Sequence, residues 1–186
     1  TLAVRKGNVD YGGRTTFASH ENYLHHRPPA ELQPALAPHL VSRIVFTGAG
    51  GFDPFNRRRS RFVLSPRALF MRSVAATSAP GGLALVDGRA QPHCAGFHRQ
   101  HLVCADANRS HLSMFLRLGT TALVVALIDA GCAEADEVKL VEPLQALVTV
   151  ARDTTLRQRL DLASGRQATA LDIQRHYLRQ ARRSLV

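Results

Sequence analysis

The stretch from Ser110 to Ala130 constrains the fold of this chain more than any other part of its sequence. It is strongly apolar over about six helical turns. Gly131 follows it directly, at the position that glycine favours after the last turn of a helix. Because the apolar residues are not confined to one stripe, we expect this helix to be buried at the centre of the fold.

The remaining segments mix strands and helices without the regular alternation of βαβ units. Strands are expected at residues 1–4, 19–24, 62–74 (one strand or a pair), 83–86 and 100–105, with a hairpin at 160–166 that turns at Ser164-Gly165. Helices are expected at 30–45, where Pro34 and Pro38 would kink the chain, at 142–152, and from Thr169 onward, where Thr169 and Asp172 form a capping box. The predicted fold class is α+β.

The composition suits one folded domain. Of the 186 residues, 45% are hydrophobic and 20% are charged, which is the usual globular mix. The longest nearly uncharged apolar run, Leu118 to Ile128, is shorter than the roughly 20 residues of a membrane span, so no membrane is expected. Cys94, Cys104 and Cys132 are an odd number without an export signal, which predicts reduced thiols and a cytoplasmic location.

The net charge of +10 arises from 24 Lys and Arg against 14 Asp and Glu, and almost all of the basic residues are arginine. Guanidinium groups bind phosphates and carboxylates in a bidentate manner, so a partner that carries either group is expected. Nucleic acid is not favoured, because the chain has no tryptophan and only 6% aromatic residues for base stacking.

Two short segments contain residues suited to chemistry. His20 and Asn22 follow a glycine-rich loop that permits close backbone approach, so the imidazole could reach a metal or a phosphate. Arg89 and His93 flank a proline, and both could face one anion. The structural alternatives are an ordinary hydrogen-bonded histidine in the first segment and a solvated turn in the second.

Three other clusters have simpler interpretations. A zinc site is conceivable from His93, Cys94, His98, His101 and Cys104, but their spacings do not match those of known zinc motifs. The run of Arg57, Arg58, Arg59 and Arg61 is typical of a solvated loop. Asp106 and Asn108 are expected to cap the helix that begins near Ser110.

Several motifs, taken in order, resemble the family of the prokaryotic ubiquitin-like protein (Pup) ligase and the Pup deamidase/depupylase. The most specific are Ser-His-Glu-Asn-Tyr-Leu at 19–24 and Ala-Leu-Asp-Ile-Gln-Arg at 170–175. Supporting matches are Gly-Asn-Val-Asp at 7–10, Leu-Val-Ser-Arg at 40–43, Thr-Gly-Ala-Gly at 47–50, Leu-Ser-Pro-Arg at 64–67, Asp-Ala-Asn at 106–108 and Leu-Gly-Thr-Thr-Ala-Leu-Val at 118–124.

This resemblance implies a glutamine synthetase-like fold of the carboxylate-amine ligase superfamily, with a curved antiparallel sheet backed by helices. It implies ATP and Mg²⁺ as cofactors on the concave face. His20 would lie near the metal and phosphate, with Asn22 as a further cofactor contact. Arg43, Arg67, Arg89 and His93 would line the phosphate and carboxylate side of the sheet, where cationic donors stabilise developing charge.

The chain also departs from the family pattern. The N-terminal strand with paired glutamates for Mg²⁺ and the strand with the catalytic aspartate are absent, as is the smaller C-terminal domain. Residues 1–186 are thus expected to be a single partial domain, the central to C-terminal portion of the large catalytic domain, incomplete without an upstream segment. Where relatives carry Arg-Asp-Glu-Pro-His, this chain has Arg89-Ala-Gln-Pro-His93.

These departures favour one chain of a processed or two-chain depupylase-like enzyme. An upstream chain would supply the metal-binding glutamates and the catalytic aspartate, and an acidic ubiquitin-like protein would be a further partner. The alternatives are Pup-ligase chemistry, which joins a glutamate to a lysine, and a non-catalytic module that holds a nucleotide or an acidic partner. Thr1 is a candidate catalytic residue for self-cleavage, since its amine could act as its own base; the alternative is that another protease sets this N-terminus.

Overall fold

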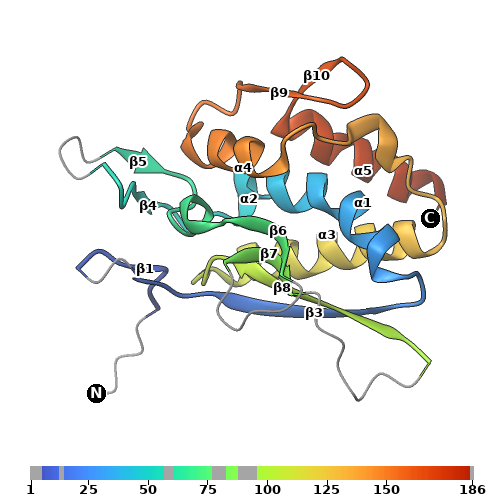
Figure 1. Ribbon diagram of the computed structural model, residues 1–186, viewed down its shortest axis with the longest axis horizontal. Coiled ribbons are helices and arrows are strands. Elements are labelled where there is room, and N and C mark those ends of the chain that lie inside the picture. The colour runs from blue at the N-terminus through green and yellow to red at the C-terminus, as the bar shows by residue number, and fades with distance from the viewer. Residues whose placement is uncertain (1–5, 13–14, 57–60, 77–82, 88–95, 185–186) are drawn as a thin grey trace.

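The computed structural model describes residues 6–12, 15–56, 61–76, 83–87 and 96–184 (Figure 1). Its strands are β1 (Val9–Asp10), β2 (Thr15–Thr16), β3 (Ser19–His25), β4 (Gly51–Phe52), β5 (Phe62–Val63), β6 (Ser73–Ala76), β7 (Ala84–Asp87), β8 (His98–Ala105), β9 (Arg159–Asp161) and β10 (Gln167–Thr169). Its α-helices are α1 (Pro29–Ser42), α2 (Ile44–Thr47), α3 (His111–Asp129), α4 (Pro143–Arg152) and α5 (Ala170–Ser184), with 3₁₀ helices η1 (Arg67–Phe70) and η2 (Ala135–Val138). The strand expected at residues 1–4 lies outside the described residues.

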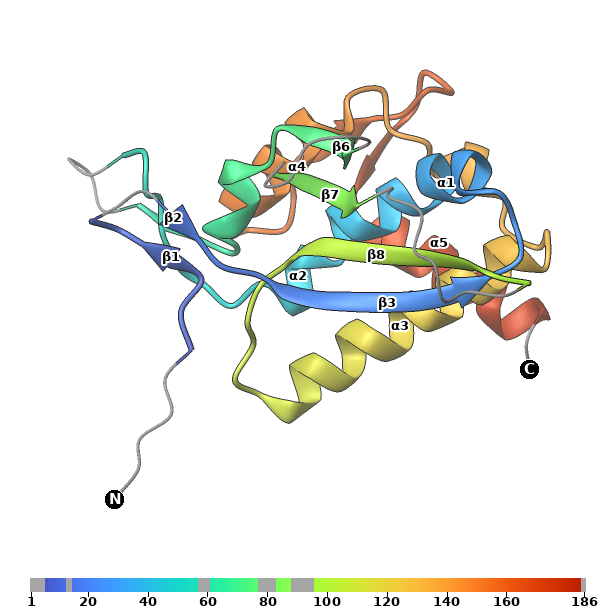
Figure 2. The ribbon, with the colours of Figure 1, turned by 60° about the horizontal axis from the view of Figure 1, so that its bottom comes forward.

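The main sheet has four strands in the order β3-β8-β7-β6. β8 runs antiparallel to both of its neighbours, whereas β6 and β7 pair in parallel. A register shift between Ser19 and Glu21 interrupts the β3–β8 pairing. The helices form a layer over one face of this sheet, and Figure 2 shows the opposite face turned toward the viewer. The predicted α+β fold is confirmed.

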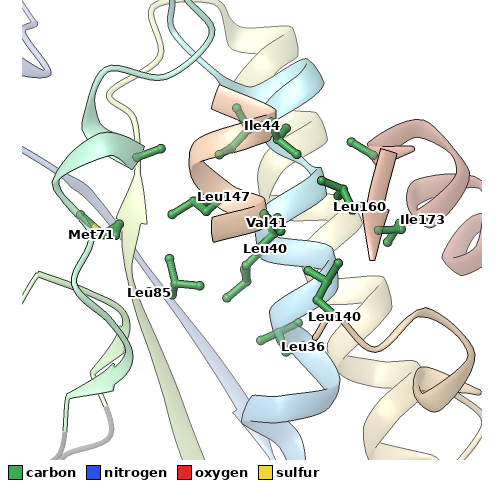
Figure 3. Packing of buried hydrophobic residues seen from close by; sticks show 14 of the residues in the cluster. Leu36, Leu40, Val41, Ile44, Met71, Leu85, Leu140, Leu147, Leu160 and Ile173 are labelled. Carbon is green, nitrogen blue, oxygen red and sulfur yellow. The ribbon is translucent and has the colours of Figure 1, made fainter. Parts of the chain in front are cut away.

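The helix expected at 30–45 is present as α1 and α2, which meet at Arg43. Proline at the first helical position suits the start of α1, because the N–H that proline lacks has no helical partner there. Leu36 and Leu40 are spaced four residues apart, so both point to the same side, where they are buried. Figure 3 shows Leu40 and Leu147 directed toward Leu85 of β7. Each such leucine contributes roughly 1.5–3 kcal/mol on burial.

The predictions for the C-terminal part are confirmed. β9 and β10 form the expected hairpin, and Gly165 at its turn has a φ of 80°, a conformation that glycine adopts at little cost. At the start of α5, the amide of Asp172 donates to the Thr169 hydroxyl at 3.2 Å while the amide of Thr169 donates to the Asp172 carboxylate at 3.1 Å. This reciprocal pair is a capping box.

The segment 62–74 is not the strand or strand pair that was expected. Only its two ends are extended, as β5 and the start of β6, and the 3₁₀ helix η1 lies between them. Pro66 precedes this helix with a φ of −61°, which suits the start of a helical turn. The apolar run is buried without being a strand, because its side chains pack beneath the sheet and against α4.

The helix α3 forms as predicted, but the sequence predicts a buried central helix and the structure buries only one side of it. Ser110 accepts a hydrogen bond from the amide of Ser113 at 3.4 Å, and Gly131 ends the helix with a φ of 72°. One side packs against α1, α2, α5 and β3. The other side is exposed, with Phe115 at 72% and Leu112 at 66% exposure. By length and composition α3 could cross a membrane, yet its packed side is that of a helix in a folded domain.

Candidate functional site

The strand β3 sorts its side chains between the two faces of the sheet. Glu21, Tyr23 and His25 face the helices and are buried or partly buried, whereas His20 and Asn22 are exposed on the open face. This alternation follows from the period of two residues in a strand. The sequence motif at 19–24 therefore contributes polar groups to both faces.

The open face brings together three side chains from three adjacent strands. Antiparallel pairing sets His101 of β8 opposite Asn22 of β3 on one side and opposite Asp87 of β7 on the other. His101 Nε2 lies 3.0 Å from His20 Nδ1, and His101 Nδ1 lies 3.5 Å from Asp87 Oδ2. We call Asp87, His101 and His20 the open-face triad.

The electrostatics of the triad favour one arrangement of protons. The carboxylate of Asp87 stabilises a proton on Nδ1 of His101, so Nε2 of His101 accepts a hydrogen bond. Nδ1 of His20 is then the donor. Neutral His20 consequently keeps a lone pair on Nε2, and this exposed nitrogen can accept a proton, or when protonated can donate to an anion.

The helix side of the same strands holds a buried ion pair. Arg43 donates to both carboxylate oxygens of Glu21, at 2.8 and 3.0 Å, and to the Thr121 hydroxyl at 2.6 Å. Both charged residues are 2% exposed. Burial opposes the charge of Arg43, but the adjacent Glu21 outweighs it and raises the pKa of the guanidinium above its ordinary value.

The expectation that Arg43 lines the phosphate side of the sheet is therefore wrong. Its guanidinium is on the helix side, with Glu21, Thr121 and the thiol of Cys104 around it. The network continues through Thr121 to His39, whose Nε2 lies 3.0 Å from the hydroxyl oxygen. Arg43 thus fixes β3 to α1 and α3, and so holds the strand that displays His20.

Arg67 does not reach the open face as a free cation either. Its guanidinium donates to the carbonyl of Val103 in β8 and, at 3.1 Å, to the hydroxyl of Thr16. Burial lowers the pKa of Arg67 from its ordinary value. Arg67 is only 4% exposed. Its hydrogen bonds to Val103 and Thr16 join β8 to the segment before β3.

The glycine-rich loop packs against the segment 106–108. The amide of Ala107 donates to Asn8 Oδ1 at 2.6 Å, and Lys6 Nζ donates to the Asn108 carbonyl at 3.1 Å. A cavity of about 500 Å³ lies between this loop and the start of α3. Lys6, Asn8, Gly48, Gly50, Arg109 and Ser110 are among its lining residues.

The capping role expected of Asp106 and Asn108 is wrong, since Ser110 caps α3. Asp106 instead accepts from the Ser65 hydroxyl and the amide of Ala49, at 3.0 and 2.9 Å. Asn108 donates to the Thr47 carbonyl at 2.8 Å. Short polar side chains that bond to the backbone are common in caps and in loops alike, which explains the error.

The other predicted site residues, Thr1, Arg89 and His93, lie outside the described residues. Cys94 and the arginines at 57–59 do so too. Among the described residues no group of three or more His, Cys, Asp or Glu side chains could hold a metal ion. The zinc hypothesis fails there because His101 is on the open face while Cys104 points to Arg43.

Sequence reasoning did not identify the triad as a unit. Asp87 was not singled out, and His101 was considered only as a zinc ligand. Arg117 was also missed: from within the apolar helix α3 it donates to Ser19 at 2.9 Å and to Asn108 Oδ1 at 3.1 Å. A charged residue inside an apolar run is the one signal that could have revealed it.

Comparison with known proteins gives consistent matches over the whole chain. The family model described as Pup-ligase protein matches residues 1–186. The chain is 38% identical to the depupylase of Acidothermus cellulolyticus, over 98% of this chain and 37% of that protein. It is 37% identical to the Pup deamidase/depupylase of Mycobacterium tuberculosis and 34% identical to the Pup–protein ligase of Kribbella flavida, over 95% of this chain and 36% and 39% of those proteins.

Two solved structures share the fold. The Pup ligase PafA in complex with ADP superposes with a TM-score of 0.79 at 29% identity, over 99% of this chain and 41% of PafA. The complex between Pup and PafA gives a TM-score of 0.76 at 28% identity, over 96% of this chain and 36% of that one. The chain thus spans about two fifths of the length of the relatives that it matches.

Proposed function

The chain belongs to the Pup-ligase family, and from that premise we propose that it is part of a depupylase-like enzyme. The reaction is hydrolysis of a side-chain amide or isopeptide bond of Pup, with Mg-ATP or phosphate as cofactor. The net charge of +10 suits an acidic partner such as a ubiquitin-like protein, and the relative PafA forms a complex with Pup.

The observation that carries the proposal is the open-face triad. His20 is exposed at the centre of a family motif, and its orientation is set by His101 and Asp87. The exposed Nε2 of His20 can accept or release a proton, as imidazole groups do in general acid–base catalysis. Positioning by a second imidazole and a carboxylate keeps this nitrogen facing the site, as orienting groups do in other acid-base constellations.

The donor set of this face does not suit Mg²⁺. Mg²⁺ prefers six oxygen ligands in octahedral geometry, usually one or two carboxylates, phosphate oxygens and water. The described open face offers the imidazole of His20, the amide of Asn22 and one carboxylate, Asp87, which lies beside His101. These residues alone do not fit a magnesium site.

A phosphate group fits the same residues better. His20 and Asn22 are both exposed on β3, two residues apart and on the same face, so the Asn22 amide and the Nε2 of protonated His20 can donate to one phosphate. The relative PafA binds ADP. When bound, the nucleotide supplies phosphate charge and, in ligase chemistry, the activating phosphoryl group. The part played by this chain is to bind that phosphate and to orient it through His20.

We favour hydrolysis over ligation because the sequence identity is 37–38% to depupylases and 34% to ligases, a modest difference. The test uses the purified protein with ATP and Mg²⁺. The substrate is a fluorescent peptide joined to the C-terminal side chain of Pup through an isopeptide bond. We expect release of the peptide with far less than one ADP formed per bond cleaved.

One ADP formed per isopeptide bond made would assign the ligase reaction instead. Binding of nucleotide or Pup without turnover of either kind would leave a non-catalytic module and would refute the enzymatic proposal. A His26→Ala variant is the matched control, because this exposed histidine lies beyond the end of β3 and stacks on Phe97.

A further inference from the structure

The pairing of β3 with β8 is irregular at His20, the residue on which the proposed function depends. The two strands run side by side across the molecule (Figure 2), and their register shifts at this position. Ser19 pairs with Ala105, and Glu21 pairs with Leu102. The single residue between the two pairs on β3 therefore faces two residues on β8. Two residues opposite one define a β-bulge, which bends the strand and increases its local twist.

Arg67 bonds directly to the bulged strand. A bulge disrupts the ladder and leaves backbone groups that other donors must satisfy. The carbonyl of Val103, one of the two residues in the bulge, accepts from Nε of Arg67 at 3.2 Å and also from Nη2. Nη1 of the same guanidinium donates to the Thr16 hydroxyl at 3.1 Å. Arg67 thus joins the bulge to the segment that leads into β3.

Two further arginines bond to the other residues around the bulge. Arg117 donates to Ser19 Oγ at 2.9 Å, and Arg43 donates to both carboxylate oxygens of Glu21. These two acceptors flank the exposed histidine along β3. Nη2 of Arg43 also lies 3.8 Å from the sulfur of Cys104, the second residue of the bulge. Each of the four residues around the histidine is therefore bonded to an arginine.

The burial of these arginines favours a role beyond stability. Arg43, Arg67 and Arg117 are 2%, 4% and 3% exposed. Desolvation of a buried charge opposes much of the energy that its bonds contribute, so buried ionic groups are weak evidence for stability. A fully bonded polar network can instead specify one arrangement of the chain. The arrangement specified here is the register of β8 on β3, because a one-residue slip moves the side chains of a strand to the other face.

We infer that Arg67 and Arg117 are positioning residues for His20: they hold the bulge in register, and the bulge directs the imidazole toward His101. The inference rests on the proposed function, because it concerns the same site. The two histidines are diagonal neighbours, which are about 7–8 Å apart in a regular sheet. Their ring centroids lie 4.9 Å apart, and Nδ1 of His20 lies 3.0 Å from Nε2 of His101. A change in the direction of the His20 side chain would break this hydrogen bond.

The first readout is the kinetics of isopeptide cleavage by the purified protein. We expect Arg67→Met to lower kcat by at least about tenfold while KM stays within about twofold, because the acid–base group is misdirected but substrate binding is retained. Arg67→Lys should lie between Arg67→Met and the parent, since an ammonium group keeps a donor but loses the guanidinium fork. Arg152→Met is the matched control and should keep the parental kcat. Among the described residues the Arg152 guanidinium bonds only to the buried carboxylate of Asp53, at 3.0 Å.

The second readout is nitrogen-15 NMR of the histidine side chains, which needs no turnover. Protonated and unprotonated ring nitrogens have distinct shifts, and His20→Ala assigns the signals of His20. The parent and Arg152→Met should show Nδ1 of His20 as a hydrogen-bond donor, whereas Arg67→Met should lose this signal. Urea denaturation should show a loss of stability in both methionine variants, so that stability alone does not explain a difference between them.

A parental kcat in Arg67→Met, an unchanged His20 signal in that variant, or an equal loss of kcat in Arg152→Met would overturn the inference. If Arg67→Met does not fold, Arg67→Lys is judged by the same two readouts. If the parent protein shows no turnover, the proposed function fails, and the His20 signal alone decides whether Arg67 positions this side chain.

Discussion

Replacement of Arg43 by methionine should destabilise the protein strongly, because Arg43 and Glu21 form its most deeply buried ion pair among those described. Both residues are 2% exposed, and two hydrogen bonds of 2.8 and 3.0 Å join them. Removing one partner of such a pair typically costs about 3–5 kcal/mol, since the other charge stays buried. Glu21 would keep the Tyr23 hydroxyl at 2.7 Å and Arg117 at 3.5 Å, so we expect a loss near the lower end, about 3 kcal/mol.

Urea denaturation followed by circular dichroism measures this loss. With a slope of about 2–3 kcal/mol per molar urea, the midpoint should fall by about 1–1.5 M at an unchanged slope. Arg175→Met is the matched control, because Arg175 is 65% exposed and faces Asp172 at 3.6 Å, a pair worth about 0–1 kcal/mol. Pairing Arg43→Met with Glu21→Gln should recover part of the loss. A single Arg43→Met variant within about 1 kcal/mol of the parent would refute the account of this pair.

Three further predictions follow from groups elsewhere in the fold. Burial, with Arg43 nearby, holds the pKa of His39 well below its ordinary 6.5, so the unfolded state binds the extra proton. The contribution of His39 to the free energy of unfolding should therefore be full above about pH 6.5 and should fall by up to about 1.4 kcal/mol per pH unit below it. Urea denaturation at several pH values measures this dependence. In His39→Gln the dependence should be smaller by the share of one proton. Burial raises the pKa of the Cys104 thiol, whereas Cys132 is exposed, so mass spectrometry should find Cys132 alkylated first and Cys104 only on unfolding; equal rates would contradict the fold there. Gly131→Ala should lower the thermal midpoint by several degrees, about 1 kcal/mol or more, because φ is 72° and the added Cβ would lie 2.7 Å from a guanidinium nitrogen; an unchanged midpoint would contradict this.

The local elements could be predicted from the sequence because their signals are local. The capping box at Thr169 and Asp172 and the glycine at 131 involve residues a few positions apart. The full burial of α3 could not be judged in the same way. The apolar pattern of α3 shows that all of its sides could pack against other elements. It does not show which elements of the fold lie against each side.

The site was predicted only in part, for a geometric reason. The motif at 19–24 drew attention to His20 and Asn22, which do reach the open face. The residues that orient His20 come from other strands, so only the sheet register shows that Asp87 and His101 adjoin it. The family resemblance implies a phosphate-side role for Arg43, whereas the guanidinium neutralises Glu21, 22 positions away in the sequence.

The central claim is that this chain contributes a His20-centred site to a depupylase-like enzyme. The most direct measurement compares isopeptide cleavage of a Pup conjugate by the parent protein, His20→Ala and His26→Ala. The account predicts a loss of at least about a hundredfold in His20→Ala and the parental rate in His26→Ala. Cleavage by His20→Ala at the parental rate would contradict it.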